Sequence, residues 1–288
     1  MLSRYAFRSA MLVFMATLLQ PVLQPLSAKD SLETVTQIRL KSALEVRIDG
    51  ARVHWVDVNR LLWEYPDGAS IFKLHYSPDA QLRLQGDRIM GGKELVLVPS
   101  EDKAWTDVRD VYRHIRHWPQ MIIMAGKDQV RDMLRSQILA AAYDADGRLL
   151  QITHVQTPGV IDALFTYDGT LGPEYRDNDI SVKVWAPTAQ KVRLRIYDEN
   201  KQPIGIIDPV ADAGISGVWK FSGDSNWDRK FYRFLVQVYH HADNRIHEYE
   251  VTDPYSVSLS TNSEYSQFVN LDDDDLKPDG WDTMVKSL

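Results

Sequence analysis

The stretch that decides the fold reads ISVKVWAPTAQKVRLRIY, from Ile180 to Tyr197. Apolar and polar residues alternate over 180–185 and again over 192–197, which is the pattern of two half-buried β-strands. Residues 230–240 carry Tyr232, Phe234, Val236 and Val238 on one face of a predicted strand. Strands that recur about every ten residues over 172–272, without long helices, predict an immunoglobulin-like β-sandwich.

A second β-rich domain is expected before this sandwich, over residues 36–157. Alternating runs at 43–48 and 71–76 predict further strands. One segment, 127–137, instead has apolar residues at helical spacing and predicts a short helix. Residues 158–171 are rich in glycine and proline, as expected of a linker. The predicted fold is therefore mainly β, with two consecutive β-sandwich-like domains.

Composition excludes several classes of function. The 288 residues include 33 basic and 40 acidic side chains, for a net charge of −7. This balance argues against binding to nucleic acid, which requires basic side chains to neutralise phosphates. The chain has no cysteine, which rules out disulfides, thiolate metal sites and cysteine nucleophiles. Its apolar runs are shorter than the roughly 20 residues that span a bilayer, so no membrane span is predicted.

The first 28 residues have the features of an export signal. Arg4 and Arg8 form a basic start, an apolar stretch covers 10–19, and a plausible cleavage site ends at Ala28. We expect cleavage of residues 1–28 and a periplasmic or secreted product, with the exact site of cleavage left open. Because no cysteine lies at this junction, a lipoprotein is not expected.

Several motifs, in the same order as in a known family, resemble the front part of bacterial pullulanases. Residues 184–198 resemble the opening of a family-48 carbohydrate-binding module, and 249–267 are similar to the end of that module. Residues 157–162 and 167–172 resemble the pullulanase inter-domain join, and 53–57 with 61–63 resemble the start of the domain before the module. The resemblance covers roughly residues 50–282.

The resemblance implies a role in α-glucan metabolism without catalysis by these residues. Pullulanases hydrolyse α-1,6 branches in a (β/α)₈ barrel, which takes about 250 residues. Residues 273–288 resemble only a truncated approach to that barrel, so no catalytic residue is assigned and the chain is predicted to be inactive alone. It would at most bind or position an α-glucan such as starch, glycogen or pullulan.

Two alternatives remain open at this point. The chain could be a stand-alone secreted glucan-binding protein, or a scaffold that forms a complex with a separately encoded catalytic barrel. The sequence leaves open whether the ending is that of a real gene product or of an incomplete gene.

Two tryptophans are the candidate carbohydrate-binding residues. Trp227 lies in a polar loop, where an exposed ring could stack on the C–H face of a sugar. Trp219 lies in a strand, where packing in the core is the competing interpretation. Packing is also expected for Trp185, Trp55 and Trp63.

No metal or other cofactor is predicted. His114 and His117 are spaced to share a helical face, but they lack a third ligand. His240 and His241 are adjacent, so in a strand they point to opposite sides and cannot chelate together. The four aspartates at 272–275 lack the spacing of a calcium loop and are interpreted as an acidic linker.

Overall fold

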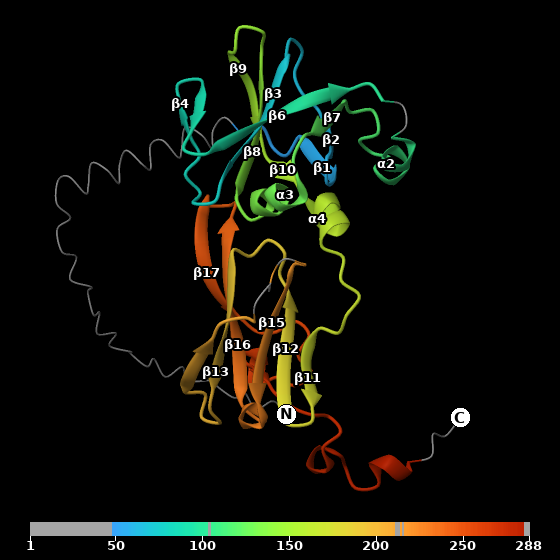
Figure 1. Cartoon of the computed structure of the whole chain (residues 1–288), viewed down its shortest axis with the longest axis vertical. Helices are drawn as coiled ribbons and strands as arrows, with labels where there is room; N and C mark the ends of the chain where they lie inside the picture. Colours follow the sequence, from blue (N-terminus) through green and yellow to red (C-terminus); the bar gives the residue numbers. More distant parts are fainter. Residues whose placement is uncertain (1–47, 103–104, 211–213, 215, 285–288) are drawn as a thin grey trace, which may run out of the picture. The chain divides into compact units, whose positions relative to one another are not determined.

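The structure is a computed structural model that describes residues 48–102, 105–210, 214 and 216–284 (Figure 1). The described residues belong to one compact unit, which covers 40–288. The predicted signal peptide at 1–28 lies outside the described residues, as does nearly all of the strand predicted at 43–48.

The N-terminal sheet domain, residues 48–164, is built on one eight-stranded sheet with the order β10-β1-β2-β7-β6-β3-β8-β9. These strands are β1 (Val53–Asp57), β2 (Arg60–Trp63), β3 (Ile71–Ser77), β6 (Lys93–Ser100), β7 (Gln120–Ile123), β8 (Gln137–Tyr143), β9 (Leu149–Thr153) and β10 (Val155–Gln156). A separate small hairpin is formed by β4 (Arg83–Gln85) and β5 (Arg88–Met90). The strand predicted at 71–76 is therefore confirmed as β3.

Three short helices accompany this sheet. They are α2 (Thr106–Val111), α3 (Lys127–Leu134) and α4 (Pro158–Leu164). Helix α3 confirms the helix predicted from its apolar spacing, and its Val130, Met133 and Leu134 are buried. Helix α4 begins with a proline, whose fixed φ suits the first turn of a helix. The first part of the predicted linker at 158–171 is therefore helical.

The sandwich, residues 172–268, consists of two antiparallel sheets. One has the order β11-β12-β15, and the other has the order β14-β13-β16-β17, with β18 paired to β16. Their bounds are β11 (Gly172–Arg176), β12 (Asp179–Trp185), β13 (Lys191–Tyr197), β14 (Pro203–Ile207), β15 (Val218–Asp224), β16 (Phe231–His240), β17 (Arg245–Val251) and β18 (Ser266–Gln267). Short 3₁₀ turns occupy Ser225–Trp227, Thr261–Ser263, Asp274–Leu276 and Trp281–Thr283.

The core of the sandwich confirms the immunoglobulin-like architecture. Val182 and Phe221 come from one sheet, and Leu194 and Phe234 from the other, and all four are fully buried in one cluster. Alternating strand residues therefore supply the two inner faces, as sheet-on-sheet packing requires. The predicted strands at 180–185, 192–197 and 230–240 are confirmed as β12, β13 and β16.

Strand β14 lies at an edge of the sandwich. Among the described strands it pairs only with β13. Ile204 and Ile206 on this strand are 58% and 46% exposed. The edge therefore combines open backbone groups with apolar side chains.

Polar contacts connect the N-terminal sheet domain to the sandwich. The Arg135 Nε donates a hydrogen bond to the backbone carbonyl of Pro187 over 3.2 Å, and its guanidinium lies 5.9 Å from the centre of the Trp219 ring. The Gln190 side chain donates to the carbonyl of Arg135 over 2.9 Å. Arg135 therefore contacts the sandwich through both its side chain and its backbone.

Candidate functional site

An aromatic pocket of about 320 Å³ lies where the segment after α4 meets strand β12. Its lining residues are Asp162, Phe165, Thr166, Tyr167, Leu171, Trp185 and Tyr255. This volume is at the lower end of the range for small-molecule sites, which are mostly apolar with a few polar groups. We call this feature the aromatic pocket.

The pocket gathers residues from four separate stretches that the sequence analysis singled out. Asp162 and Tyr167 come from the two stretches of the inter-domain join, Trp185 from the opening of the module, and Tyr255 from its end. These residues are up to about 90 positions apart in the chain. They meet because the fold places the end of α4, strand β12 and the segment after β17 next to one another. Sequence motifs that had no shared role are thus brought to one site.

The ring of Trp185 is held in place by a hydrogen bond. Its indole Nε1 donates to the backbone carbonyl of Phe165 over 3.0 Å. Phe165 is itself buried at 1% exposure, so the acceptor is fixed by the core. Because Trp185 is only half-buried, part of its ring remains available at the pocket.

Tyr255 is positioned through the buried carboxylate of Asp253. The backbone N–H of Tyr255 donates to Asp253 Oδ1 over 2.9 Å, and the hydroxyl of Tyr232 donates to Asp253 Oδ2 over 2.7 Å. Burial raises the pKa of Asp253, while these two hydrogen bonds oppose the rise by stabilising the carboxylate. The Tyr255 side chain itself remains 38% exposed.

Gly172 fixes the other side of Tyr255. Its φ is +83°, and a Cβ placed there would lie 2.6 Å from the carbonyl oxygen of Tyr255. Only glycine combines this backbone conformation with so close an approach. The position of Tyr255 therefore depends on a backbone contact at the start of β11.

The arrangement suits recognition of a sugar. Aromatic rings can cover the C–H face of a pyranose, and nearby carboxylate and hydroxyl groups can bind its hydroxyls. Trp185, Tyr167 and Tyr255 supply the rings, and Asp162 and Thr166 supply exposed polar groups. The pocket therefore has both components of a carbohydrate-binding site.

The two tryptophans predicted to bind carbohydrate lie elsewhere, inside the sandwich. Trp227 is 9% exposed and stacks on Phe268, with ring centres 5.2 Å apart. Trp219 is 6% exposed, and its Nε1 donates to the carbonyl of Ala186 over 3.0 Å. Sugar contact by these two residues stays a prediction, and their burial leaves no open ring face to support it. Trp55 and Trp63, at 1% and 0% exposure, pack in the core as expected.

The acidic stretch and the histidines that the sequence analysis considered as metal ligands lie in different surroundings. The acidic stretch at 272–275 forms ion pairs with Arg229, whose Nη2 lies 2.6 Å from Asp273 and 2.9 Å from Asp275. The ring centre of His241 lies 5.8 Å from that of His240 and 6.3 Å from that of His154. His117 is exposed at the surface.

Sequence reasoning missed Tyr255 and Tyr167 as candidates for binding. Both lie in turn-like stretches, and the sequence alone does not show which aromatic rings in such stretches are exposed. The available signal was that each lies within a stretch resembling the same family, which tied them to one region of the molecule.

The immunoglobulin-like sandwich is the architecture of one class of carbohydrate-binding module. Residues 170–256 match the model of carbohydrate-binding module 48, also described as the isoamylase N-terminal domain. Residues 50–163 match the model of the pullulanase N2 domain. The chain therefore carries the N-terminal region of the pullulanase family, as the sequence predicted.

Individual pullulanases show the same relationship. The chain is 36% identical to the pullulanase of Klebsiella pneumoniae and 35% identical to pullulanase 1, chloroplastic, of Arabidopsis thaliana, over 82% of its own length in each case. It spans only 22% and 24% of these two proteins.

Solved structures agree with the sequence comparisons. The structure of apo pullulanase from Klebsiella pneumoniae matches with a TM-score of 0.76 at 35% identity, covering 83% of this chain and 26% of the other. PulA from Klebsiella oxytoca matches with a TM-score of 0.76 at 36% identity, covering 83% of this chain and 22% of the other. Within the described part of this chain, no helix is long and apolar enough to cross a membrane.

Proposed function

We propose that this chain is the non-catalytic N-terminal part of a pullulanase-type α-1,6-glucan debranching enzyme, and that it binds or positions an α-glucan in the aromatic pocket. The observation that carries the proposal is that the rings of Tyr167, Trp185 and Tyr255 line one pocket together with the carboxylate of Asp162. Starch, glycogen and pullulan are the candidate ligands, because all three present chains of α-linked glucose.

The pocket supports binding and not hydrolysis. Cleavage of a glycosidic bond uses two carboxyl groups held roughly 5–10 Å apart across the bond. The lining of the pocket contains one carboxylate, that of Asp162. The sheets of the described residues likewise form no closed ring of eight parallel strands. Catalysis in the intact enzyme is therefore assigned to a barrel outside the described residues.

The proposal includes an exported product. Residues 1–28 would act as a cleaved signal peptide, and the product would be periplasmic or secreted and would not be a lipoprotein. The basic start and apolar stretch of these residues support this part of the proposal.

Affinity electrophoresis in gels containing glycogen or pullulan tests glucan binding. The chain should be retarded, and Tyr255→Ala should weaken binding about tenfold, which corresponds to roughly 1.4 kcal/mol. Tyr249→Ala is the matched control, since Tyr249 is 39% exposed, as against 38% for Tyr255, but lies outside the pocket. Retardation should be unchanged in this control.

Two results would contradict the proposed site. The first is that neither glycogen nor pullulan retards the chain. The second is retardation that Tyr249→Ala and Tyr255→Ala reduce equally. A parallel assay for new reducing ends on pullulan should show none above buffer. Hydrolytic activity that copurifies with the chain would overturn the non-catalytic assignment.

The scaffold alternative has its own test. A purified catalytic barrel added in trans should form a complex with the chain that elutes as one species in size-exclusion chromatography. Complex formation without glucan retardation would favour the scaffold, whereas retardation without a complex would favour the stand-alone binding protein.

A further inference from the structure

The hairpin of β16 and β17 brings two imidazoles to one face. In its register His240 pairs with Arg245, and Val238 pairs with His247. His247 is therefore the diagonal neighbour of His240, because side chains two residues apart in a strand share a face. The two rings lie with centres 5.9 Å apart. Pairing between strands, and not adjacency along the chain, brings these histidines together.

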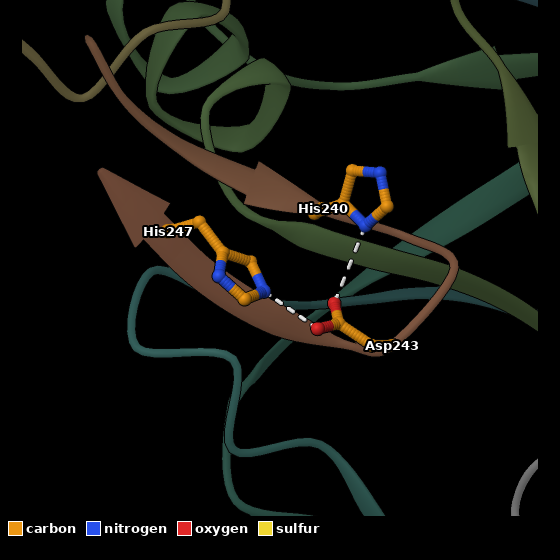
Figure 2. A group of neighbouring side chains, drawn as sticks. All are labelled: His240, Asp243 and His247. Carbon is orange, nitrogen blue, oxygen red and sulfur yellow. Dashed lines mark hydrogen bonds and ion pairs between the residues drawn. The ribbon is translucent and has the colours of Figure 1, made fainter. Parts of the chain in front are cut away.

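The turn of the hairpin adds a carboxylate between the rings. Figure 2 shows Asp243 with His240 on one side and His247 on the other. Asp243 Oδ2 lies 2.5 Å from His247 Nε2, and Oδ1 lies 3.3 Å from His240 Nδ1. All three ligand atoms lie within 4.8 Å of one another.

We propose that His240, Asp243 and His247 form a binding site for a divalent transition-metal ion, with Zn²⁺ as the best match. Imidazole and carboxylate are the ligands that zinc takes, and imidazole favours zinc, copper and nickel over calcium or magnesium. Around a tetrahedral zinc the ligand atoms are about 3.4 Å apart, given metal–ligand bonds of about 2.0–2.2 Å. The three side chains are partly exposed, and the present separations of up to 4.8 Å require only a small change to reach this spacing.

The charges around the group favour a cation. Asp243 supplies a carboxylate whose two oxygens face the two imidazoles. Arg245 lies across from His240 and opposes binding, although its side chain is exposed and free to extend into solvent.

Neighbouring rings orient the ligands. Tyr249 stacks on His247, with ring centres 5.5 Å apart and planes inclined by 30°. His240 is the last residue of β16 and Asp243 lies in the turn, so a bound ion would link the turn to both strands. With three protein ligands, the remaining coordination positions would be taken by water.

Isothermal titration with zinc chloride tests the proposal. The whole chain is prepared without a histidine tag and freed of metal by a chelator, because a tag would bind zinc itself. We expect saturable binding of one ion, with His240→Ala and His247→Ala each weakening it at least about tenfold, since each removes one of three ligands. Cobalt chloride should give the visible absorption of a four- or five-coordinate Co²⁺ centre, and both variants should lose it.

Two matched controls separate this site from general binding to histidine. His241→Ala removes the imidazole next to His240, and His117→Ala removes an exposed imidazole in the N-terminal sheet domain. Neither should change the affinity, and circular dichroism should show all four variants folded. An absence of saturable zinc binding would overturn the proposal, as would binding that persists unchanged in both His240→Ala and His247→Ala. The result is independent of glucan binding, which these titrations do not involve.

Discussion

His75 is a buried imidazole on strand β3. It is 4% exposed, and its Nε2 lies 2.9 Å from the hydroxyl of Tyr143. Burial lowers the pKa of His75 to about 4, while Glu94 opposes this change and Lys73 adds to it. The folded state therefore keeps this ring neutral at pH values where the unfolded chain, with an ordinary histidine pKa, binds a proton.

This shift makes stability depend on pH in a known direction. Between about pH 6.5 and pH 4 the unfolded state binds more protons, so the free energy of unfolding should fall as the pH falls, by up to about 3 kcal/mol from this group. His75→Gln cannot bind the proton and should lose less stability over that range. Urea unfolding at several pH values measures both slopes, and equal slopes would show that His75 does not titrate in this way.

At the scale of elements, the start of β11 controls one wall of the aromatic pocket. Gly172→Ala would place a Cβ 2.6 Å from the Tyr255 carbonyl at a φ of +83°. We expect a loss of about 1–3 kcal/mol in the free energy of unfolding, because both the backbone conformation and the contact become strained. Glucan retardation should also fall, since Tyr255 must move.

Gly205→Ala is the matched control for this substitution. Gly205 lies on β14, and a Cβ there would meet no atom within 4 Å. Its stability and glucan retardation should remain close to those of the unchanged chain. If both variants behave alike in urea unfolding and in the glycogen gel, Gly172 has no special role at the pocket.

Strands with regular alternation could be predicted, because alternation directly reports a half-buried strand. The runs that became β3, β12 and β13 alternate in the sequence, and α3 shows helical spacing. Helix α4 was not predicted, because its sequence begins with Pro158 and Gly159 and looks like a linker. Its stability comes from tertiary contacts: Val160 is fully buried in the core of the N-terminal sheet domain.

The candidate sites could be predicted only in part, because they depend on contacts between distant segments. A loop tryptophan such as Trp227 looks exposed in the sequence, but Phe268, some 40 residues later, covers it. The aromatic pocket needs Trp185 and Tyr255, which meet only once both sheets have formed. His240 finds His247 only through the register of a hairpin, which alternation alone does not determine.

At the scale of the whole molecule, Arg135 couples the N-terminal sheet domain to the sandwich. Arg135→Ala removes the hydrogen bond to Pro187 and the contact with the Trp219 ring. We expect a loss of about 1–3 kcal/mol, since a partly buried carbonyl loses its donor. Scanning calorimetry should show one unfolding transition for the unchanged chain and two for Arg135→Ala.

Arg148→Ala is the control for the loss of an arginine. Its side chain is 68% exposed, and its Nε lies 3.4 Å from Asp144, a surface ion pair that contributes little to stability. One transition at an almost unchanged temperature is expected for this variant. A single transition in Arg135→Ala as well would mean that the two domains unfold together without this contact.

The open sheet edge at β14 has a consequence for the purified chain in the absence of other proteins. Strands left unpaired at a sheet edge are templates for recruiting a strand from another molecule, and natural proteins usually protect them with charges or prolines. Here Pro203 opens the strand, but Ile204 and Ile206 follow with no charge between them. In concentrated solution, the purified chain should therefore tend to form oligomers through pairing of β14 edges. In the cell, a partner that covers β14 would prevent this pairing.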